Sequence, residues 1–296
     1  MIPTKLSAAI AADREQSVDI ALAEDIGDGD VTAALVGVDE IAEARVIVRE
    51  PAIICGQPWF ELVFAKVDAK VTITWHVEEG EHVDTDQPIC ELHGSARSIL
   101  TAERAALNFL QTLSGTATTT HHFVQEVATT GCRLLDTRKT IPGLRTAQKY
   151  ATAIGGAVNH RIGLYDAILI KENHIASAGG TISAAVSAAR NANPGLSVEI
   201  EVESLDELRD ALDANVERVL LDNFSHQQLR EAVALNTAHA HRCELEASGG
   251  VERDQLRAIA DTGVDYISIG ALTKHLRATD FSMRFRFRSA SPQSDS

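Results

Sequence analysis

The second half of the chain alternates short apolar segments with amphipathic ones, and this alternation restricts the fold more than any other feature. Strand-like apolar segments occur at 132–136, 167–171, 197–203, 218–223, 243–248 and 266–270. Strand–helix repetition of this kind builds a parallel sheet with right-handed crossovers. Six units within about 140 residues favour a small or incomplete α/β barrel over an open sheet. No G-x-G-x-x-G or Walker sequence supports a nucleotide-binding fold instead.

Helices are expected between these strands. Ser204 with Glu207 and Ser225 with Gln228 have the capping-box spacing that begins a helix. Gly263 is a candidate C-cap. The predicted helices cover 182–192, 205–213, 226–235 and 252–262.

The first half of the chain has a different pattern, with β-rich segments at 44–50, 70–77 and 88–94. The stretch 77–94 is similar to the hairpins of biotinyl and lipoyl carrier domains. Such carriers need a lysine at the hairpin tip, and none is present, so we interpret this part as a structural β-domain. A helical passage follows at 101–127. Near the C-terminus, residues 281–288 alternate phenylalanine or methionine with arginine or serine, which predicts a half-buried strand that returns to the first domain.

Composition excludes several classes of protein. Asp and Glu number 42 against 27 Lys and Arg, a net charge of −15, and only 4% of residues are aromatic. These values argue against a nucleic-acid-binding or membrane-surface protein. No apolar run approaches the roughly 18 residues of a membrane span, and the N-terminal apolar stretch is too short for a secretory signal. A cytoplasmic protein with reduced thiols is expected, because no CxxC pair occurs among the cysteines at 55, 90, 132 and 243.

Charged residues and glycine turns follow the predicted barrel strands at the ends where barrels carry their reacting groups. They are Thr137-Arg138-Lys139, Lys171, Glu201, Asp222, Ser248-Gly249-Gly250 and Gly270-Ala271. Charge at a strand end can also serve solubility alone, but this explanation is weaker for the whole set. Residues 137–171 contain six Lys or Arg and one acid, Asp166, in an otherwise acidic chain. A pocket with several fixed cations would bind phosphates, pyrophosphate or carboxylates.

Other residues complete this predicted site. The Ser248–Gly250 and Gly270 turns can present backbone N–H groups to a phosphate. Glu201 and Asp222 are natural partners of sugar hydroxyls and hydrated Mg²⁺, although Glu199 and Glu203 share the face of Glu201 and leave that choice open. No histidine has metal-ligand spacing, and only His160, next to Arg161, lies in the basic window. Nothing supports a covalent nucleophile.

These motifs together resemble the quinolinate phosphoribosyltransferase family. The matching segments run in order through nearly the whole chain: EDIGDGDVT (24–32), ERAALNFLQTLSGTAT (103–118), DTRKTIPGLRTAQKYA (136–151), GGAVNHRIGLYDAILIKENHI (155–175), EIEVESLDEL (199–208), LLDN (220–223), LEASGGV (245–251) and ISIGALTKH (267–275).

The resemblance implies a fold and a reaction. The fold is an N-terminal α+β open-faced sandwich domain followed by an incomplete α/β barrel. We accordingly expect a sandwich domain at 1–115 that is joined by a strand at 276–290, a barrel domain at 116–275 and a disordered tail at 291–296. The implied reaction joins quinolinate to 5-phosphoribosyl-1-pyrophosphate with Mg²⁺, and yields nicotinate mononucleotide, pyrophosphate and CO₂ for de novo NAD synthesis.

The resemblance also implies residue roles. Arg138, His160 and Arg161 resemble residues that hold the quinolinate carboxylates, and Arg104 resembles an arginine that reaches the neighbouring subunit's site, in a homodimer or a larger homo-oligomer. Lys139 and Lys171 resemble cations on the pyrophosphate side. Glu201 and Asp222 resemble the pair that serves the ribose hydroxyls and, through water, Mg²⁺. The predicted 5′-phosphate loops contain Ser248, Gly249, Gly250 and Gly270.

Three alternatives remain open on sequence. A paralogue, such as the molybdenum-transport-associated homologue, would take another acceptor at the same phosphoribosyl site. A nicotinate-specific transferase would need fewer cations, because nicotinate has one carboxylate. A non-catalytic protein that binds phosphorylated metabolites would keep binding without turnover.

Overall fold

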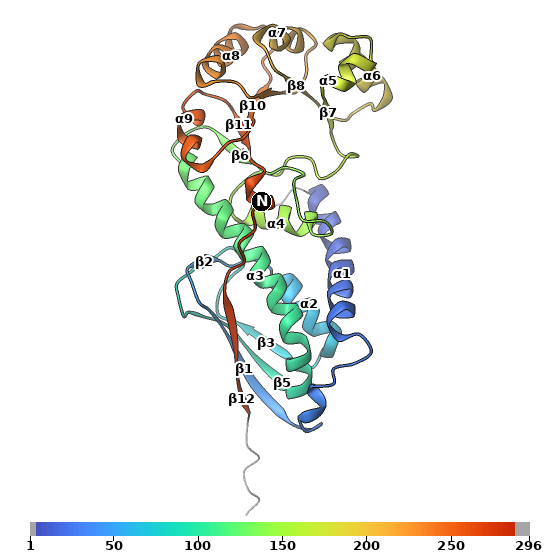
Figure 1. Ribbon diagram of the computed structural model, residues 1–296, viewed down its shortest axis with the longest axis vertical. Coiled ribbons are helices and arrows are strands. Elements are labelled where there is room, and N and C mark those ends of the chain that lie inside the picture. The colour runs from blue at the N-terminus through green and yellow to red at the C-terminus, as the bar shows by residue number, and fades with distance from the viewer. Residues whose placement is uncertain (1–3, 288–296) are drawn as a thin grey trace, which may run out of the picture. The chain divides into compact units, whose positions relative to one another are not determined.

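The computed structural model describes residues 4–287, which form two compact units (Figure 1). The first unit contains residues 4–119, 142–155 and 276–287, and the second contains 120–141 and 156–275. Residues 288–290 of the expected C-terminal strand and the expected tail at 291–296 lie outside the described residues.

The first unit is built on an antiparallel sheet with strand order β12-β1-β5-β3. Its strands are β1 (Ile41–Val48), β3 (Thr72–Trp75), β5 (Pro88–Ser95) and β12 (Phe281–Phe287), and β2 (Ala52–Ile53) pairs separately with β4 (His82–Val83). Its helical elements are α1 (Thr4–Ile26), the 3₁₀ turn η1 (Ala33–Leu35), α2 (Gln57–Asp68), the first part of α3 (Ala96–Val127) and α4 (Arg145–Ile154). Neither α1 nor α2 was among the helices predicted from the sequence.

One face of this sheet is buried and the other is exposed. Ala42, Ala44 and Val46 alternate along β1 with more exposed residues, and all three are buried. The apolar core beside them includes Trp59, Phe60 and Phe64 of α2. The predicted open-faced sandwich is therefore confirmed.

The C-terminal strand returns to the first unit by passing close to α3. Thr279 N donates to the carbonyl of Gln111 at 3.0 Å. A β-carbon at Gly115 would collide with the backbone carbonyl of Arg277, so only glycine permits this approach. β12 then pairs with β1 over its whole length.

Residues 142–155 do not group with the barrel, although the sequence placed them there. They carry α4, whose buried face contacts α1. The ring of Tyr150 lies 5.2 Å from that of Trp59, measured between centroids. Burial of this aromatic face explains why α4 joins the first unit.

The second unit contains a parallel sheet with strand order β6-β11-β10-β9-β8-β7. Its strands are β6 (Arg133–Leu135), β7 (Ile168–Ile170), β8 (Val198–Val202), β9 (Arg218–Asp222), β10 (Glu244–Ser248) and β11 (Tyr266–Ser268). No ladder between the edge strands β6 and β7 is present in the described residues, so the predicted incomplete barrel is confirmed.

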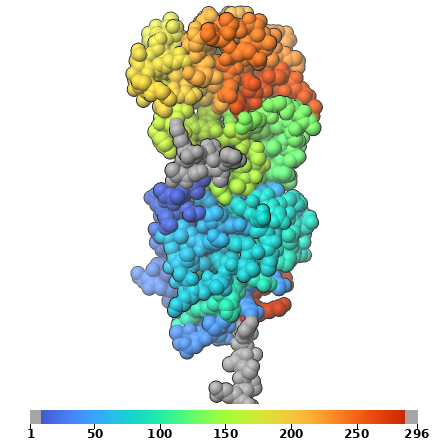
Figure 2. Space-filling view, turned by 180° about the vertical axis from the view of Figure 1, so that it is seen from behind, coloured from blue at the N-terminus to red at the C-terminus, as the bar shows by residue number. Residues whose placement is uncertain are grey.

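Helices lie outside this curved sheet, and their side chains form the yellow and orange surface in Figure 2. They are α5 (Glu172–Ser177), α6 (Ile182–Ala192), α7 (Leu205–Asp213), α8 (His226–Ala238), α9 (Leu256–Ala260) and α10 (Ala271–Lys274). Both predicted caps form, because Ser204 Oγ accepts from Glu207 N and Ser225 Oγ accepts from Gln228 N. The helix predicted at 252–262 is wrong in extent: a 3₁₀ turn η2 (Arg253–Gln255) precedes the short α9. No helix within residues 4–287 is long and apolar enough to span a bilayer.

Candidate active site

A cavity of about 510 Å³ lies at the carboxyl ends of the barrel strands, formed by residues of the second unit alone. Eleven of the twelve site residues expected from sequence line it: Arg138, Lys139, His160, Arg161, Lys171, Glu201, Asp222, Ser248, Gly249, Gly250 and Gly270. Arg104, the twelfth, lies on α3 in the first unit, with 62% of its side chain exposed.

Two arginines give one part of this cavity an excess of positive charge. Burial and the nearby charge of Arg138 both lower the pKa of Arg161. Nε of Arg138 is buried and has no hydrogen-bond partner among residues 4–287. Arg161 is oriented by donation from Nη1 to the carbonyl of Ala167 at 3.3 Å. Two guanidinium groups this close favour an anion between or beside them, since Arg binds carboxylates through its forked donors.

The buried carboxylate of Asp136 fixes the segment that carries the histidine and the second arginine. It accepts from Nδ2 of Asn159 at 2.6 Å and from the backbone N of His160 at 2.8 Å. These bonds tie the loop after α4 to the end of β6. Asp136 begins the DTRKT motif, but this positioning contact could not be predicted from the motif alone.

The carboxylates expected to serve ribose and Mg²⁺ lie close to the two lysines. Nζ of Lys171 forms an ion pair with Oε2 of Glu201. Burial and the negative charge of Glu201 raise the pKa of Asp222, while Lys171 and Lys139 partly offset this effect. A cation held near these carboxylates would relieve their repulsion, and hard oxygen ligands of this kind suit Mg²⁺. The residues present therefore fit the metal that the sequence predicts.

The turn after β10 depends on glycine. Gly249 has φ +109°, and a β-carbon there would lie 2.9 Å from the backbone N of Asn223 and closer still to its Oδ1. Asn223 Nδ2 in turn donates to Oδ2 of Asp222 at 2.8 Å. Gly250 also has a positive φ, of +56°, but a β-carbon there would meet nothing within 4 Å of the described structure. The backbone of this turn is suited to phosphate contacts. It packs against Asn223, the residue that donates a hydrogen bond to Asp222.

A buried acidic pair lies behind His160, and the sequence did not single it out. Oε2 of Glu199 is 2.7 Å and Oε2 of Glu246 is 3.7 Å from Nε2 of His160. Burial would raise the pKa of Glu199, but the hydrogen bond and charge of His160 lower it overall. Burial and the charge of Glu199 raise the pKa of Glu246 well above its usual range. The sequence feature that could have indicated Glu199 is its period-two spacing from Glu201, which places both residues on one side of β8.

Further residues depart from the sequence expectation. Arg145 and Lys149 belong to the basic window but lie on α4, in the first unit, and do not line the cavity. Lys274 and His275 do line it, although no role was expected for either. Glu203, an open alternative to Glu201, is not among the lining residues.

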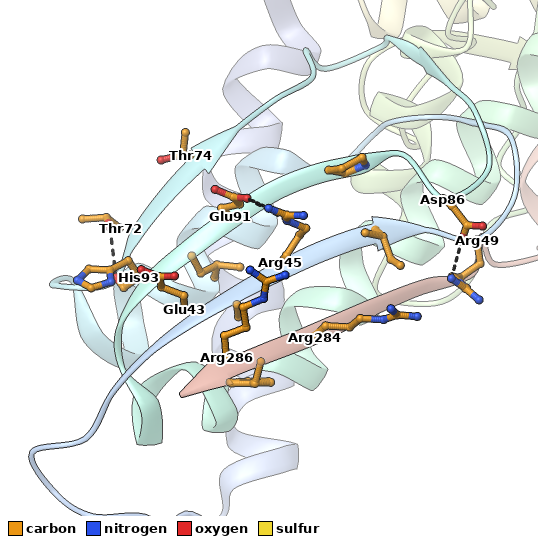
Figure 3. Close-up of a pocket in the computed structure, with 15 residues that line it drawn as sticks. Glu43, Arg45, Arg49, Thr72, Thr74, Asp86, Glu91, His93, Arg284 and Arg286 are labelled. Atoms are coloured by element: carbon orange, nitrogen blue, oxygen red, sulfur yellow. Dashed lines mark hydrogen bonds and ion pairs between the residues drawn. The ribbon is translucent and has the colours of Figure 1, made fainter. Parts of the chain in front are cut away.

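A larger hollow, of about 1150 Å³, covers the exposed face of the sheet in the first unit (Figure 3). Its charges largely compensate one another. Arg45 pairs with Glu91 and Arg49 pairs with Asp86, as the dashed lines in Figure 3 mark. It also lacks the glycine turns and strand ends of the barrel cavity, which is accordingly the stronger candidate for catalysis.

Two family models match most of the chain. The model described as quinolinate phosphoribosyl transferase, N-terminal domain, matches residues 30–114, and the corresponding C-terminal domain model matches residues 116–284. The chain belongs to the quinolinate phosphoribosyltransferase family.

Individual relatives agree with this membership. The chain is 38% identical over 260 residues to a probable nicotinate-nucleotide pyrophosphorylase [carboxylating] of Bacillus subtilis, covering 88% of this chain and 89% of the relative. It is 40% identical over 267 residues to the nicotinate-nucleotide pyrophosphorylase [carboxylating] of Mycobacterium leprae, covering 89% and 94%. The solved nicotinate-nucleotide pyrophosphorylase of Francisella tularensis is similar in structure, with a TM-score of 0.89, 46% identity and coverage of 97% of this chain and 98% of that one.

Proposed function

We propose that this protein transfers the phosphoribosyl group of 5-phosphoribosyl-1-pyrophosphate to quinolinate and releases CO₂ and pyrophosphate. The product is nicotinate mononucleotide, an intermediate of de novo NAD synthesis. The observation that carries the proposal is the convergence of Arg138, Arg161, Lys139 and Lys171 on one cavity of an acidic chain. Family membership supports the same conclusion.

The charges of the two substrates account for the cations. Quinolinate carries two carboxylates, and we assign them to Arg138, His160 and Arg161, which line the cavity together. The donor carries several phosphate charges. We assign its 5′-phosphate to the turns at Ser248–Gly250 and Gly270, where backbone N–H groups can bind it. Fixed cations and backbone dipoles bind such anions without reorganising during the reaction.

Loss of pyrophosphate leaves positive charge on the ribose ring. Glu201 and Asp222 stabilise that charge in this proposal, and Lys139 and Lys171 stabilise the leaving group. The ion pair of Lys171 with Glu201 must then loosen as the donor binds, because the pyrophosphate competes for the same ammonium group. The nitrogen of quinolinate attacks the anomeric carbon, and the alkylated ring accepts the electrons that the departing CO₂ leaves behind. Positioning and electrostatics supply most of the rate acceleration.

Mg²⁺ is part of the proposal. Glu201 and Asp222 would hold it, through water, where it would neutralise phosphate charge on the donor. Their mutual repulsion, expressed in the raised pKa of Asp222, supports a cation at this position.

We also propose a homodimer or a larger homo-oligomer in the cytoplasm, in which Arg104 completes the neighbouring subunit's site. The support is the resemblance of ERAALN and the exposure of the Arg104 side chain. A mixing experiment tests the shared site. Arg104→Ala and Lys171→Ala subunits, each inactive alone, should regain about one quarter of wild-type activity when exchanged into mixed dimers, because half are heterodimers with one intact site. No recovery after proven subunit exchange would contradict the shared site.

The reaction itself is tested by a paired assay with the donor and Mg²⁺, offering quinolinate or nicotinate. Equal amounts of CO₂ and nicotinate mononucleotide from quinolinate alone are expected. Product from nicotinate only would indicate a salvage-type transferase. Donor binding without product from either acceptor would indicate a paralogue with another acceptor or a binding protein. Omission of Mg²⁺ in the presence of a chelator should abolish turnover, and unchanged turnover would refute the metal's role.

A further inference from the structure

The proposed function assigns no substrate group to the buried carboxylates of Glu199 and Glu246 beside His160, although Glu246 borders the same cavity. Glu246 on β10 is fully buried, and Glu199 on β8 is 6% exposed. These two strands are separated in the sheet by β9. Both carboxylates approach the same imidazole nitrogen, Nε2 of His160. Burial of two carboxyl groups is costly, so this arrangement needs a compensating role or partner.

The direction of the short hydrogen bond follows from the geometry. Oε2 of Glu199 lies 2.7 Å from Nε2 of His160, within hydrogen-bond distance, whereas Oε2 of Glu246 lies 3.7 Å away. A carboxylate paired with an imidazole at this distance accepts from the ring N–H, so Nε2 of His160 carries the hydrogen and donates it to Glu199. A carboxylate on Nε2 fixes the orientation of the ring and leaves Nδ1 as the nitrogen that can face a ligand. The doubly protonated ring is the form that has an N–H at Nδ1 to donate to a substrate carboxylate, and a carboxylate beside Nε2 favours that form.

The backbone of His160 is fixed independently. Asp136 accepts from its N–H at 2.8 Å, so the side chain and the main chain are each held by a separate buried carboxylate. His160 lines the cavity beside Arg138 and Arg161. The imidazole therefore faces the anion site in one orientation, which reduces the entropy lost when it contacts a ligand.

We propose that Glu199, supported by Glu246, is a positioning residue that orients His160 toward a carboxylate of the acceptor substrate. This inference rests on the proposed function, in which the acceptor is a dicarboxylate. It assigns Glu199 to acceptor recognition although Glu201, two residues along the same strand, serves the ribosyl donor.

A metal ion is the competing explanation of this cluster. The ligand atoms of His160, Glu199 and Glu246 lie within 4.8 Å of one another, close enough to share an ion. Arg218 already supplies positive charge to the cluster, since its Nη1 lies 3.7 Å from Oε2 of Glu246. The cluster thus has cationic partners within the chain, which favours the positioning role.

The test is a double-mutant cycle with Glu199→Gln and His160→Ala in the full-length protein. Glu199→Gln keeps the volume of the side chain but removes its charge, and a charge-assisted hydrogen bond is worth enough to raise KM for quinolinate about tenfold. KM for the phosphoribosyl donor should change less than about twofold in the same variant. In the His160→Ala background, Glu199→Gln should have no further effect on KM for quinolinate, because the group that it orients is missing.

Glu246→Gln is the matched control, equally buried and isosteric. It should raise KM for quinolinate less than Glu199→Gln does, because Glu246 lies 3.7 Å rather than 2.7 Å from Nε2. Thermal unfolding of each variant establishes that it is folded. If Glu199→Gln does not fold, the same cycle with Glu199→Asp, which keeps the charge but shortens its reach, replaces it.

The outcomes separate the inference from the function on which it rests. Wild-type protein that does not convert quinolinate refutes both. Wild-type activity together with a Glu199→Gln effect that persists in the His160→Ala background, or that raises KM for both substrates equally, refutes the positioning role alone. One equivalent of a divalent metal in the wild-type protein that is lost in both Glu199→Gln and Glu246→Gln would also overturn it.

Discussion

Replacing Gly249 by alanine should weaken the protein and its donor site together. At φ +109° an alanine is in a region that is essentially restricted to glycine, which costs about 1–3 kcal/mol. Its β-carbon would also displace the side chain of Asn223. The bond from Asn223 to Asp222 is exposed to solvent, so its loss would cost about 0.5–1.5 kcal/mol more. We expect the free energy of unfolding to fall by about 2–4 kcal/mol, since the two costs are partly shared.

Gly250→Ala is the matched control for this prediction. Its φ of +56° lies in the left-handed region that other residues enter at about 1 kcal/mol, and its β-carbon meets no described atom within 4 Å. A smaller unfolded-state entropy partly offsets even that cost. Both variants insert one methyl group into the same turn, so they differ in the contact with Asn223 and in the greater backbone strain at position 249.

Urea unfolding measures the stability difference, and steady-state kinetics measure the donor. Gly249→Ala should raise KM for 5-phosphoribosyl-1-pyrophosphate by about tenfold or more, because it displaces the group that holds Asp222. KM for quinolinate should change much less. Equal loss of stability in the two variants, or an unchanged donor KM in a folded Gly249→Ala protein, would refute the reasoning.

The remaining predictions concern charge and thiols. Lys171→Ala should lower kcat/KM by about 10²–10³. Substrate affinity and turnover measured separately for Lys139→Ala and Lys171→Ala test whether the two lysines have distinct roles. Identical losses of affinity and turnover in the two variants would contradict distinct roles. Because the folded pKa of Glu246 is raised above its ordinary value of 4.5, the folded state retains this proton after the unfolded state has released it, so stability falls as pH rises from about 4.5 toward the folded pKa. Glu246→Gln should flatten that fall in urea titrations across this window, and an unchanged slope would be evidence against a neutral Glu246. Burial raises the pKa of Cys132 to about 12 and that of Cys243 to about 11, so neither should react with a thiol reagent at pH 8 until the protein unfolds; rapid labelling of the native protein would contradict this.

The sequence predicts the barrel well because its strands and helices are local patterns. The helix at 182–192 has its predicted bounds, since Thr181 caps its first turn and Asn193 ends it. The helix predicted at 252–262 is shorter, because the chain after Glu252 first forms a 3₁₀ turn that periodicity does not distinguish from an α-helix. Helix α2 was missed although Trp59, Phe60, Val63 and Phe64 have the spacing of one helix face and a proline stands in its first turn.

The membership of 142–155 in the first unit could not be predicted for a different reason. It depends on the packing of Tyr150 against Trp59, which are 91 residues apart in sequence. No local pattern encodes which of two cores a helix joins. The same limit applies to Arg104, whose expected role depends on a neighbouring subunit.

Depth along a strand explains why sequence found Glu201 but not the role of Glu199. The two alternate residues point to the same side of β8, and spacing alone treats them as equivalent. Glu201 is nearer the carboxyl end and keeps 18% of its side chain exposed in the cavity, whereas Glu199 lies one step deeper and keeps 7%. At the deeper position a carboxylate cannot reach a substrate, and its charge must be matched from within the barrel, here by His160. In the proposed function the barrel therefore holds acids at two depths, with Glu201 assigned to the donor and Glu199 assigned to orienting His160 toward the acceptor.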